Sequence, residues 1–199
     1  MEGRFDEARE LLATSEATFE ELGLTLSTAV SHDASTVEML AGDPVAAERI
    51  LRSGYAALEE MGDTALLSTT AAFLGQALIA QDRHKEAEGL AEISAELAAG
   101  DDLITQVLWR GVRARCLAVG GRLEEAERLA REAVTLGEAT DLLNQRADAL
   151  VDLGIVLGML SRSADAQATF AEAVRLYEQK GNVVAAGRVR SDLVMSAPL

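Results

Sequence analysis

Apolar and polar residues along this chain recur with the period of an α-helix. The stretch from Arg122 to Gly137 shows the pattern most clearly, because its charged residues fall on one helical face. The opposite face carries Leu123, Ala126, Leu129, Ala130, Ala133 and Leu136. The segments 65–80 and 150–160 are instead apolar on nearly every side, as in a helix with neighbours on both flanks. The pattern therefore predicts amphipathic outer helices that alternate with more buried inner helices.

The helical pattern recurs at a steady step. Five similar segments each carry an alanine, here called the anchor alanine, at Ala8, Ala47, Ala87, Ala126 and Ala166, at steps of 39, 40, 39 and 40 residues. Self-similarity at a fixed step is typical of repeat proteins, in which each unit is one supersecondary element.

When the five segments are aligned on their anchor alanines, three sets of equivalent positions, here called columns, predict where helices begin, cross and end. Five residues before the anchor stand turn or N-cap residues: Gly3, Gly42, Asp82, Gly121 and Ser161. Seven residues after it the side chain is small, which permits a close helix crossing: Ser15, Gly54, Ser94, Ala133 and Ala173. Fifteen residues after it comes a glycine that ends a helix or an aspartate that begins the next: Gly23, Gly62, Asp102, Asp141 and Gly181. Asp43 followed by Pro44 is the clearest helix start.

The predicted unit is a pair of antiparallel helices, and stacked helix pairs form an α-solenoid. Inner helices are expected at about 24–41, 64–80, 103–119, 142–159 and 183–194. We therefore predict an all-α fold of about ten helices and a single domain over 1–199. It would hold about four full repeats, anchored near Ala47, Ala87, Ala126 and Ala166, and half repeats at 3–22 and 183–194.

The two half repeats carry apolar residues at helical spacing, among them Phe5 and Leu11 at one end and Val183 and Val189 at the other. Stacked repeats need polar caps at both ends. We therefore expect the chain to be a piece of a longer protein, and to associate through an end or a groove, most simply as a homodimer.

The repeat units resemble the tetratricopeptide repeat (TPR). The unit that matches best has the family's first-helix and second-helix residues at Leu150, Leu153, Gly154, Leu157, Ala166, Phe170 and Ala173. The resemblance implies a right-handed α-solenoid of TPR-like helix pairs. The family's closing proline is absent, and the step exceeds the usual length of about 34 residues. This longer form resembles the C-terminal arrays of bacterial signal-transduction ATPases of the maltose-regulator type and of multidomain class III adenylate and guanylate cyclases.

Composition agrees with a helical fold, since alanine supplies 36 of 199 residues and aromatic residues only 4%. The 33 acidic and 18 basic residues leave a net charge of −15, which disfavours binding to nucleic acid or to an anionic membrane. A single cysteine, no signal peptide and no apolar stretch of spanning length favour a cytoplasmic location.

The residues of catalytic, cofactor and metal sites are missing from the sequence. It contains no P-loop, no dinucleotide-binding motif and no cysteine or histidine pair at metal spacing. His32 and His84 are 52 residues apart, and Cys116 is interpreted as a small packing residue. We therefore expect a chain that is not an enzyme and that binds no cofactor.

In the TPR family, the inner-helix positions on the concave side bind peptides. Transferred through the anchor alanines, these positions are Ala29, His32, Thr36, Met39, Thr69, Ala72, Gln76, Ile79, Leu108, Gly111, Arg115, Ala118, Asp148, Val151, Ile155 and Met159. We call them the inner-face positions. Most are small or apolar, so that an apolar helix or segment fits them better than an acidic peptide terminus. Alternatively, packing within a longer superhelix, or another copy, closes this groove.

The segment from Trp109 to Arg115 is the one basic cluster of an acidic chain, and it contains the only tryptophan. Tryptophan and arginine are enriched at binding hot spots, which predicts that Arg115 keeps its charge in solvent for a ligand. The alternative is that these arginines neutralise acidic neighbours such as Glu124 and Asp148.

These observations lead to one functional hypothesis and one alternative. The chain is expected to bind a protein, a peptide or a small regulatory ligand, as the regulatory or assembly arm of a bacterial signalling or transcription-regulating protein. The alternative is a purely structural scaffold for self-association.

Overall fold

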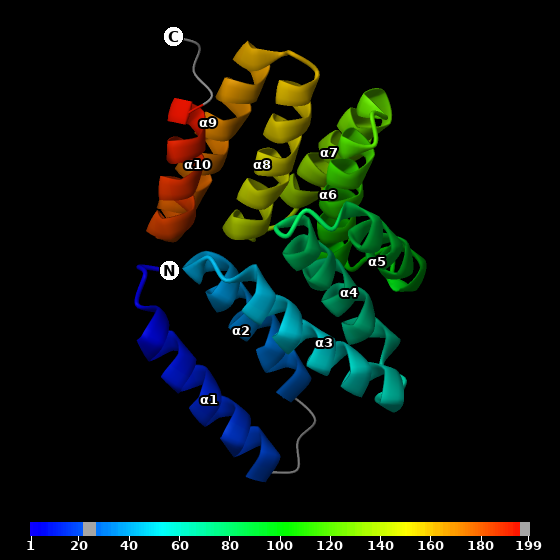
Figure 1. The fold of residues 1–199 in the computed structure, drawn as a ribbon, viewed down its shortest axis with the longest axis vertical. Helices are drawn as coiled ribbons and strands as arrows, with labels where there is room; N and C mark the ends of the chain where they lie inside the picture. The colour runs from blue at the N-terminus through cyan, green and yellow to red at the C-terminus, as the bar shows by residue number, and fades with distance from the viewer. Residues whose placement is uncertain (22–26, 196–199) are drawn as a thin grey trace. The chain divides into compact units, whose positions relative to one another are not determined.

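The computed structural model describes residues 1–21 and 27–195, and within these ranges the chain forms ten α-helices and no strand (Figure 1). The helices are α1 (Phe5–Glu21), α2 (Ser27–Ala41), α3 (Pro44–Met61), α4 (Thr64–Ile79), α5 (His84–Leu97), α6 (Leu103–Val119), α7 (Leu123–Glu138), α8 (Leu143–Met159), α9 (Ser163–Lys180) and α10 (Val183–Met195). The predicted all-α fold with alternating outer and inner helices is confirmed. The predicted helical residues 22 and 24–26 lie outside the described ranges.

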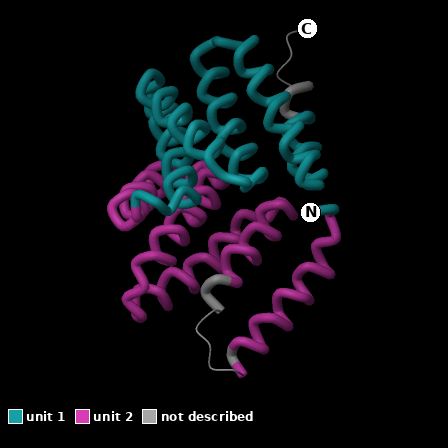
Figure 2. The backbone as a smooth tube through the Cα atoms, turned by 180° about the vertical axis from the view of Figure 1, so that it is seen from behind, with its two compact units in different colours: residues 1–2, 100–199 teal, residues 3–99 magenta. Residues whose placement is uncertain are grey.

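The chain divides into two compact units, residues 3–99 and residues 1–2 with 100–199 (Figure 2). The first holds α1 to α5, and the second holds α6 to α10. In both units an inner helix packs against the outer helices before and after it in the chain. The single domain over 1–199 stays a prediction.

The turn before each outer helix depends on a left-handed residue. All five residues of the column five before the anchor have positive φ: Gly3 at 83°, Gly42 at 90°, Asp82 at 59°, Gly121 at 79° and Ser161 at 60°. The outer helix begins two residues later each time. This column is therefore a turn position, and the N-cap is the residue that follows it, as at Asp43, whose side chain accepts from the Ala46 amide.

The column fifteen residues after the anchor is partly confirmed. Gly62 and Gly181 end α3 and α9 in the left-handed conformation, and Asp102 accepts from the Thr105 amide at the start of α6. Asp141 was the wrong residue for a cap, because the N-cap of α8 is Leu142 and no side chain caps that helix. Gly23 lies outside the described residues.

Four of the five anchor alanines are buried where helices pack together, and the fifth, Ala8, is half-buried. Ala47, Ala87 and Ala126 have 0% exposed surface, so that no larger side chain fits at these crossings. Of the small residues seven positions later, all but the half-buried Ser15 are buried, and at Gly54 an added Cβ would lie 2.8 Å from the Ser31 Oγ. The small residues thus let outer and inner helices approach.

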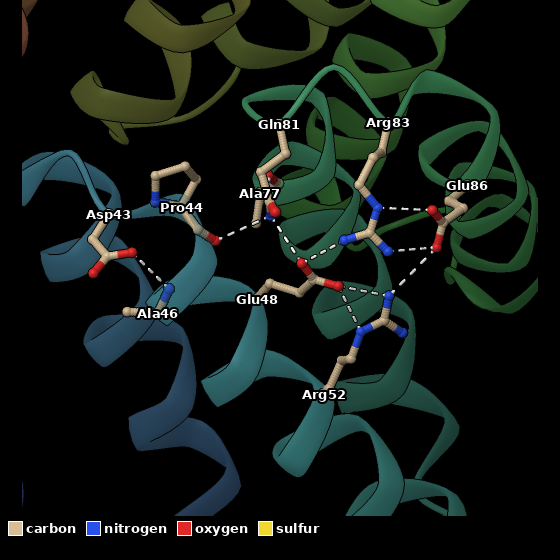
Figure 3. Close-up of polar contacts among 9 residues, drawn as sticks. All are labelled: Asp43, Pro44, Ala46, Glu48, Arg52, Ala77, Gln81, Arg83 and Glu86. Carbon is tan, nitrogen blue, oxygen red and sulfur yellow. Dashed lines mark hydrogen bonds and ion pairs between the residues drawn. The ribbon is translucent and has the colours of Figure 1, made fainter.

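An ion-pair network joins α3 to the turn between α4 and α5 (Figure 3). The buried Glu48 carboxylate accepts from Arg52 at 2.7 Å, from Arg83 at 2.7 Å and from Gln81 at 2.9 Å. Burial alone would raise the pKa of Glu48, but these three donors lower it below its usual value. Arg83 also pairs with Glu86 at 2.7 Å. The network ties one outer helix to the start of the next.

The other unit contains the same network at equivalent positions. Glu127 on α7 accepts from Arg131 and from Arg162, each at 2.7 Å. Arg162 also pairs with Asp165 at 2.7 Å, as Arg83 does with Glu86. In both units the carboxylate follows an anchor alanine directly, and the arginine precedes the next anchor by four residues. The ion pair is therefore a property of the repeat.

Two glycines on α8 provide a test of this packing. An added Cβ at Gly154 would lie 2.6 Å from the Phe170 ring, whereas at Gly158 it would meet nothing within 4 Å. Gly154→Ala should lower the free energy of unfolding by about 1–3 kcal/mol through overpacking. Gly158→Ala should raise it by about 0.5–1 kcal/mol because alanine favours the helix. Urea unfolding measures both, and equal shifts in one direction would contradict the packing.

Candidate binding surfaces on the inner helices

The inner-face positions lie on four helices that belong to different units. Those on α2 and α4 belong to residues 3–99, and those on α6 and α8 belong to the other unit. Each unit is therefore described by itself. The side chain of Ala29 lies outside the described part of the chain.

His32 on α2 turns its ring toward α4. Its Nε2 lies 2.7 Å from the Thr70 Oγ1, and its ring lies 5.0 Å from the Phe73 ring. The Thr70 hydroxyl donates to the Leu66 carbonyl oxygen, so it accepts from a neutral His32 that carries its proton on Nε2. Burial lowers the pKa of His32, which favours this neutral form. His32 thus holds α2 against α4.

The remaining positions in residues 3–99 differ in exposure. Ala72 and Ile79 are buried in the core, and Met39 packs against a core cluster that includes Leu51. The half-buried positions are Thr36, Thr69 and Gln76. The polar residues therefore supply most of the accessible part of the inner face in this unit.

The α6 positions in the other unit are largely covered by α8. Leu108 and Ala118 are buried, and an added Cβ at Gly111 would lie 2.4 Å from an Asp152 carboxylate oxygen. Only glycine permits this approach between the two helices. The α6 face therefore contributes packing surface.

Among the inner-face positions of this unit, the accessible apolar residues lie on α8. Val151 and Ile155 are half-buried, and Met159 is 43% exposed. They are spaced four residues apart and so follow one face of the helix. We call Val151, Ile155 and Met159 the α8 stripe.

Two arginines of the basic segment 109–115 make contacts within the fold. Arg115 pairs with Asp152 at 3.2 Å, and their side chains are 26% and 16% exposed. Arg110 lies over the Trp109 ring at 4.1 Å from its centroid, and pairs with Glu132 at 3.4 Å. The expectation that Arg115 keeps its charge in solvent is therefore wrong. Arg110 and Arg115 do neutralise acidic neighbours, but these are Glu132 and Asp152, because helix packing brings other carboxylates close.

Two carboxyl groups lie one turn apart on α8, and they have different partners: Arg115 pairs with Asp152, and Tyr177 contacts Asp148. Asp148 and Asp152 are one turn apart on α8, and the Tyr177 hydroxyl of α9 donates to Asp148. The pKa of Asp148 is raised to about 7, chiefly by burial; the hydrogen bond from Tyr177 opposes this shift, and the charge of Asp152 adds to it. Burial also raises the pKa of Asp152, although Arg115 opposes that shift.

The repeat pattern predicts Asp148 on the inner face, but it does not indicate that Asp152 and Tyr177 lie beside it. One signal in the sequence indicates them, namely two aspartates four residues apart in the otherwise apolar stretch 147–160. Such a pair either is buried in the helix packing or faces solvent. A buried pair of carboxyl groups needs hydrogen-bond donors from neighbouring helices. The identity of the donors was not readable from the helix itself.

The described residues contain no group of three or more His, Cys, Asp or Glu side chains arranged to hold a metal ion. Among the helices of residues 1–21 and 27–195, none is long and apolar enough to cross a membrane.

Comparison with protein families identifies tetratricopeptide repeats in two stretches. One family model matches residues 104–179, and a second TPR model matches residues 69–92. The predicted TPR character is confirmed for these repeats. The finer resemblance to ATPase and cyclase arrays stays a prediction. A search of curated proteins found no match.

Solved structures with a similar fold share little sequence with this chain. A structure of kinesin light chain-like repeats from Podosopora anserina has a TM-score of 0.55 at 18% identity, covering 90% of each chain. BtubC from P. vanneervenii has a TM-score of 0.56 at 17% identity, over 98% of this chain and 94% of its own. NprR in complex with its cognate peptide NprX has a TM-score of 0.70 at 12% identity, over 98% of this chain and 58% of its own. At these identities the likeness shows the TPR-like fold alone.

The pKa of Asp148 predicts a pH-dependent stability. The folded protein holds this proton up to about pH 7, whereas an ordinary aspartate releases it near 3.8. The unfolded chain therefore loses the proton first, and the Asp148 contribution to stability falls as the pH rises from about 4 to about 7. The loss should be on the order of 2–4 kcal/mol.

Asp148→Asn keeps an acceptor for Tyr177 and removes this titration. The variant should therefore gain stability over the wild type at pH 8, with a much smaller difference at pH 4.5. Urea unfolding at both pH values measures the difference, with the exposed Asp101→Asn as the control. A difference that does not change with pH would show that Asp148 is ionised in the folded state.

Proposed function

We propose, from the tetratricopeptide repeats that the chain carries, that it is a binding module for a peptide or protein segment. The module would serve as the regulatory or assembly arm of a bacterial signalling or transcription-regulating protein. The partner is an apolar or amphipathic helix, bound by the inner helices. The module itself needs no cofactor, no catalytic residue and no nucleic acid.

The α8 stripe is the observation that carries this proposal. Val151, Ile155 and Met159 leave apolar surface accessible on one helix face, beside a core that is otherwise well packed. A partner helix with apolar residues three or four apart matches such a row. Burying apolar surface is the main favourable contribution to association of this kind.

NprR supports the peptide as the class of partner. Its structure was solved with the peptide NprX, and its fold resembles this chain more closely by TM-score than the two other structures described above. Because the identity is only 12%, the likeness supports the kind of function and carries no contact residue over to this chain.

Self-association remains a second candidate function, and two exposed apolar side chains favour it. Leu11 on α1 is 66% exposed and Val183 on α10 is 55% exposed. Each belongs to a different unit, and a large apolar side chain with this exposure can take part in an interface between copies.

Peptide binding can be tested with peptides selected from a random phage-displayed library and then synthesised with a fluorescent label. Val151→Glu with Ile155→Glu should weaken their binding at least about tenfold, because two charges would have to be desolvated in the interface. The matched control is Gln167→Glu with Ala168→Glu, at exposed positions of α9. Fluorescence anisotropy measures the affinities. Equal weakening by both double variants would contradict binding at the α8 stripe.

Self-association is tested separately by sedimentation. If the scaffold function holds, the wild type should form dimers at about 100 µM, and Leu11→Arg should return it to monomers without a change in melting temperature. A wild-type monomer at that concentration, together with peptide binding, would leave the binding module as the only surviving function. A dimer that Leu11→Arg does not affect would exclude α1 as the interface.

A further inference from the structure

Residues 3–99 contain a cleft between α1, α2 and α3, with a volume of about 420 Å³. Its apolar walls come from Leu12 on α1, Val30 on α2 and Ile50 on α3. Its small lining residues include Ala34 and Gly54. This size and the mixture of apolar walls with a few charges are typical of sites for small ligands.

The cleft lies on a different side of α2 from the inner-face positions. Val30 and Ala34 line the cleft, whereas His32 points to Thr70 on α4. Residues two apart on a helix point in nearly opposite directions. A ligand in the cleft would therefore not compete with a partner on the inner face.

A salt bridge holds the cleft together at one end. Arg9 on α1 donates to both carboxylate oxygens of Glu38 on α2, at 2.7 Å each. Glu38 is buried, and the hydrogen bond to it raises the pKa of Arg9 above its already high ordinary value. Arg9 thus stays charged and joins α1 to α2. Arg9 and Glu38 both line the cleft, but each charge is already neutralised by the other.

Two other charges line the cleft without such a partner. Arg49 on α3 and Glu16 on α1 are exposed, and neither makes an ion pair with a described residue. A cation and an anion are therefore both available to a ligand in the same cleft.

The repeat register places these two charges at different levels along the helices. Both α1 and α3 pack against α2 and run in the direction opposite to it (Figure 1). Arg49 stands two residues after the anchor Ala47, and Glu16 stands eight residues after the anchor Ala8. Six residues of helix correspond to an offset of about 9 Å along the axis. The positive and negative charges thus lie on different walls of the cleft and at different levels along it.

We propose that this cleft binds a short zwitterionic peptide of about three residues with apolar side chains. Its terminal carboxylate pairs with Arg49, its terminal ammonium pairs with Glu16, and its side chains lie against Leu12, Val30 and Ile50. An extended chain spans at most about 3.3–3.6 Å per residue, so that three residues cover about 9–10 Å, which matches the axial offset between the two charges. The site goes beyond the proposed function, which concerns the inner face.

The chemistry distinguishes this ligand from simpler ones. An inorganic anion or a fatty acid would use Arg49 and the apolar walls but would be insensitive to Glu16. An amine would use Glu16 alone. Only a ligand with both charges, separated by about three residues, engages both ends of the cleft at once.

The probe for this proposal is the tripeptide Leu-Ala-Leu, with its N-acetyl and C-amide derivatives, titrated calorimetrically into the full chain. The free tripeptide should bind saturably with a dissociation constant below about 1 mM. Arg49→Gln and Glu16→Gln should each weaken it about tenfold. The C-amide should bind the wild type and Arg49→Gln equally, and the N-acetyl form should bind the wild type and Glu16→Gln equally.

Two controls separate the site from general charge effects. Glu10→Gln on α1 and Arg175→Gln on α9 change exposed charges that do not line the cleft, and they should leave the affinity unchanged. Ser53→Phe places a large side chain in the cleft from an exposed position of α3 and should abolish binding at an unchanged melting temperature. Absence of saturable binding up to about 10 mM, or binding that survives Ser53→Phe, would overturn the proposal.

Discussion

The close approach of outer and inner helices at the anchor alanines is the constraint on which the rest of this structure depends. With Ala47, Ala87 and Ala126 fully buried, the outer helix rests directly on its neighbour, and the small column seven residues later continues the contact for two more turns. The inner helices then have outer helices on both sides, which explains why their sequences are apolar nearly all round. Because the contact recurs every 39 or 40 residues, the same local rule builds each helix pair.

Ion pairs between successive outer helices supplement this apolar contact. The N-caps of α5, α7 and α9 are arginines whose side chains make no capping hydrogen bond. A cation at a helix N-terminus is unfavourable to the helix dipole. Arg83 and Arg162 nevertheless stand there because each reaches a carboxylate of the preceding outer helix, Glu48 or Glu127. An arginine at the N-cap thus destabilises the start of its own helix, but its ion pair stabilises the contact between successive repeats.

Two surfaces remain for binding once this packing is complete. The α8 stripe is apolar and suits a partner helix, and it supports the proposed peptide-binding function. The cleft between α1, α2 and α3 carries one free charge of each sign and suits a ligand that is itself charged at both ends. The half-buried Asp148 and Asp152 belong to neither the α8 stripe nor the cleft, and the raised pKa of Asp148 should make the stability of its unit depend on pH.

The sequence by itself determined the helices, their order and the turns between them, because those depend on residues close together in the chain. The turn residues five positions before each anchor alanine, and the small residues seven positions after it, could be predicted from the sequence. Few residue types adopt a left-handed φ or permit a close helix crossing. Only the tertiary structure decided that Leu108 is buried while Met159 is exposed, and that Arg115 pairs with Asp152. Those outcomes depend on the angle and distance between packed helices, which residues 37 positions apart set together.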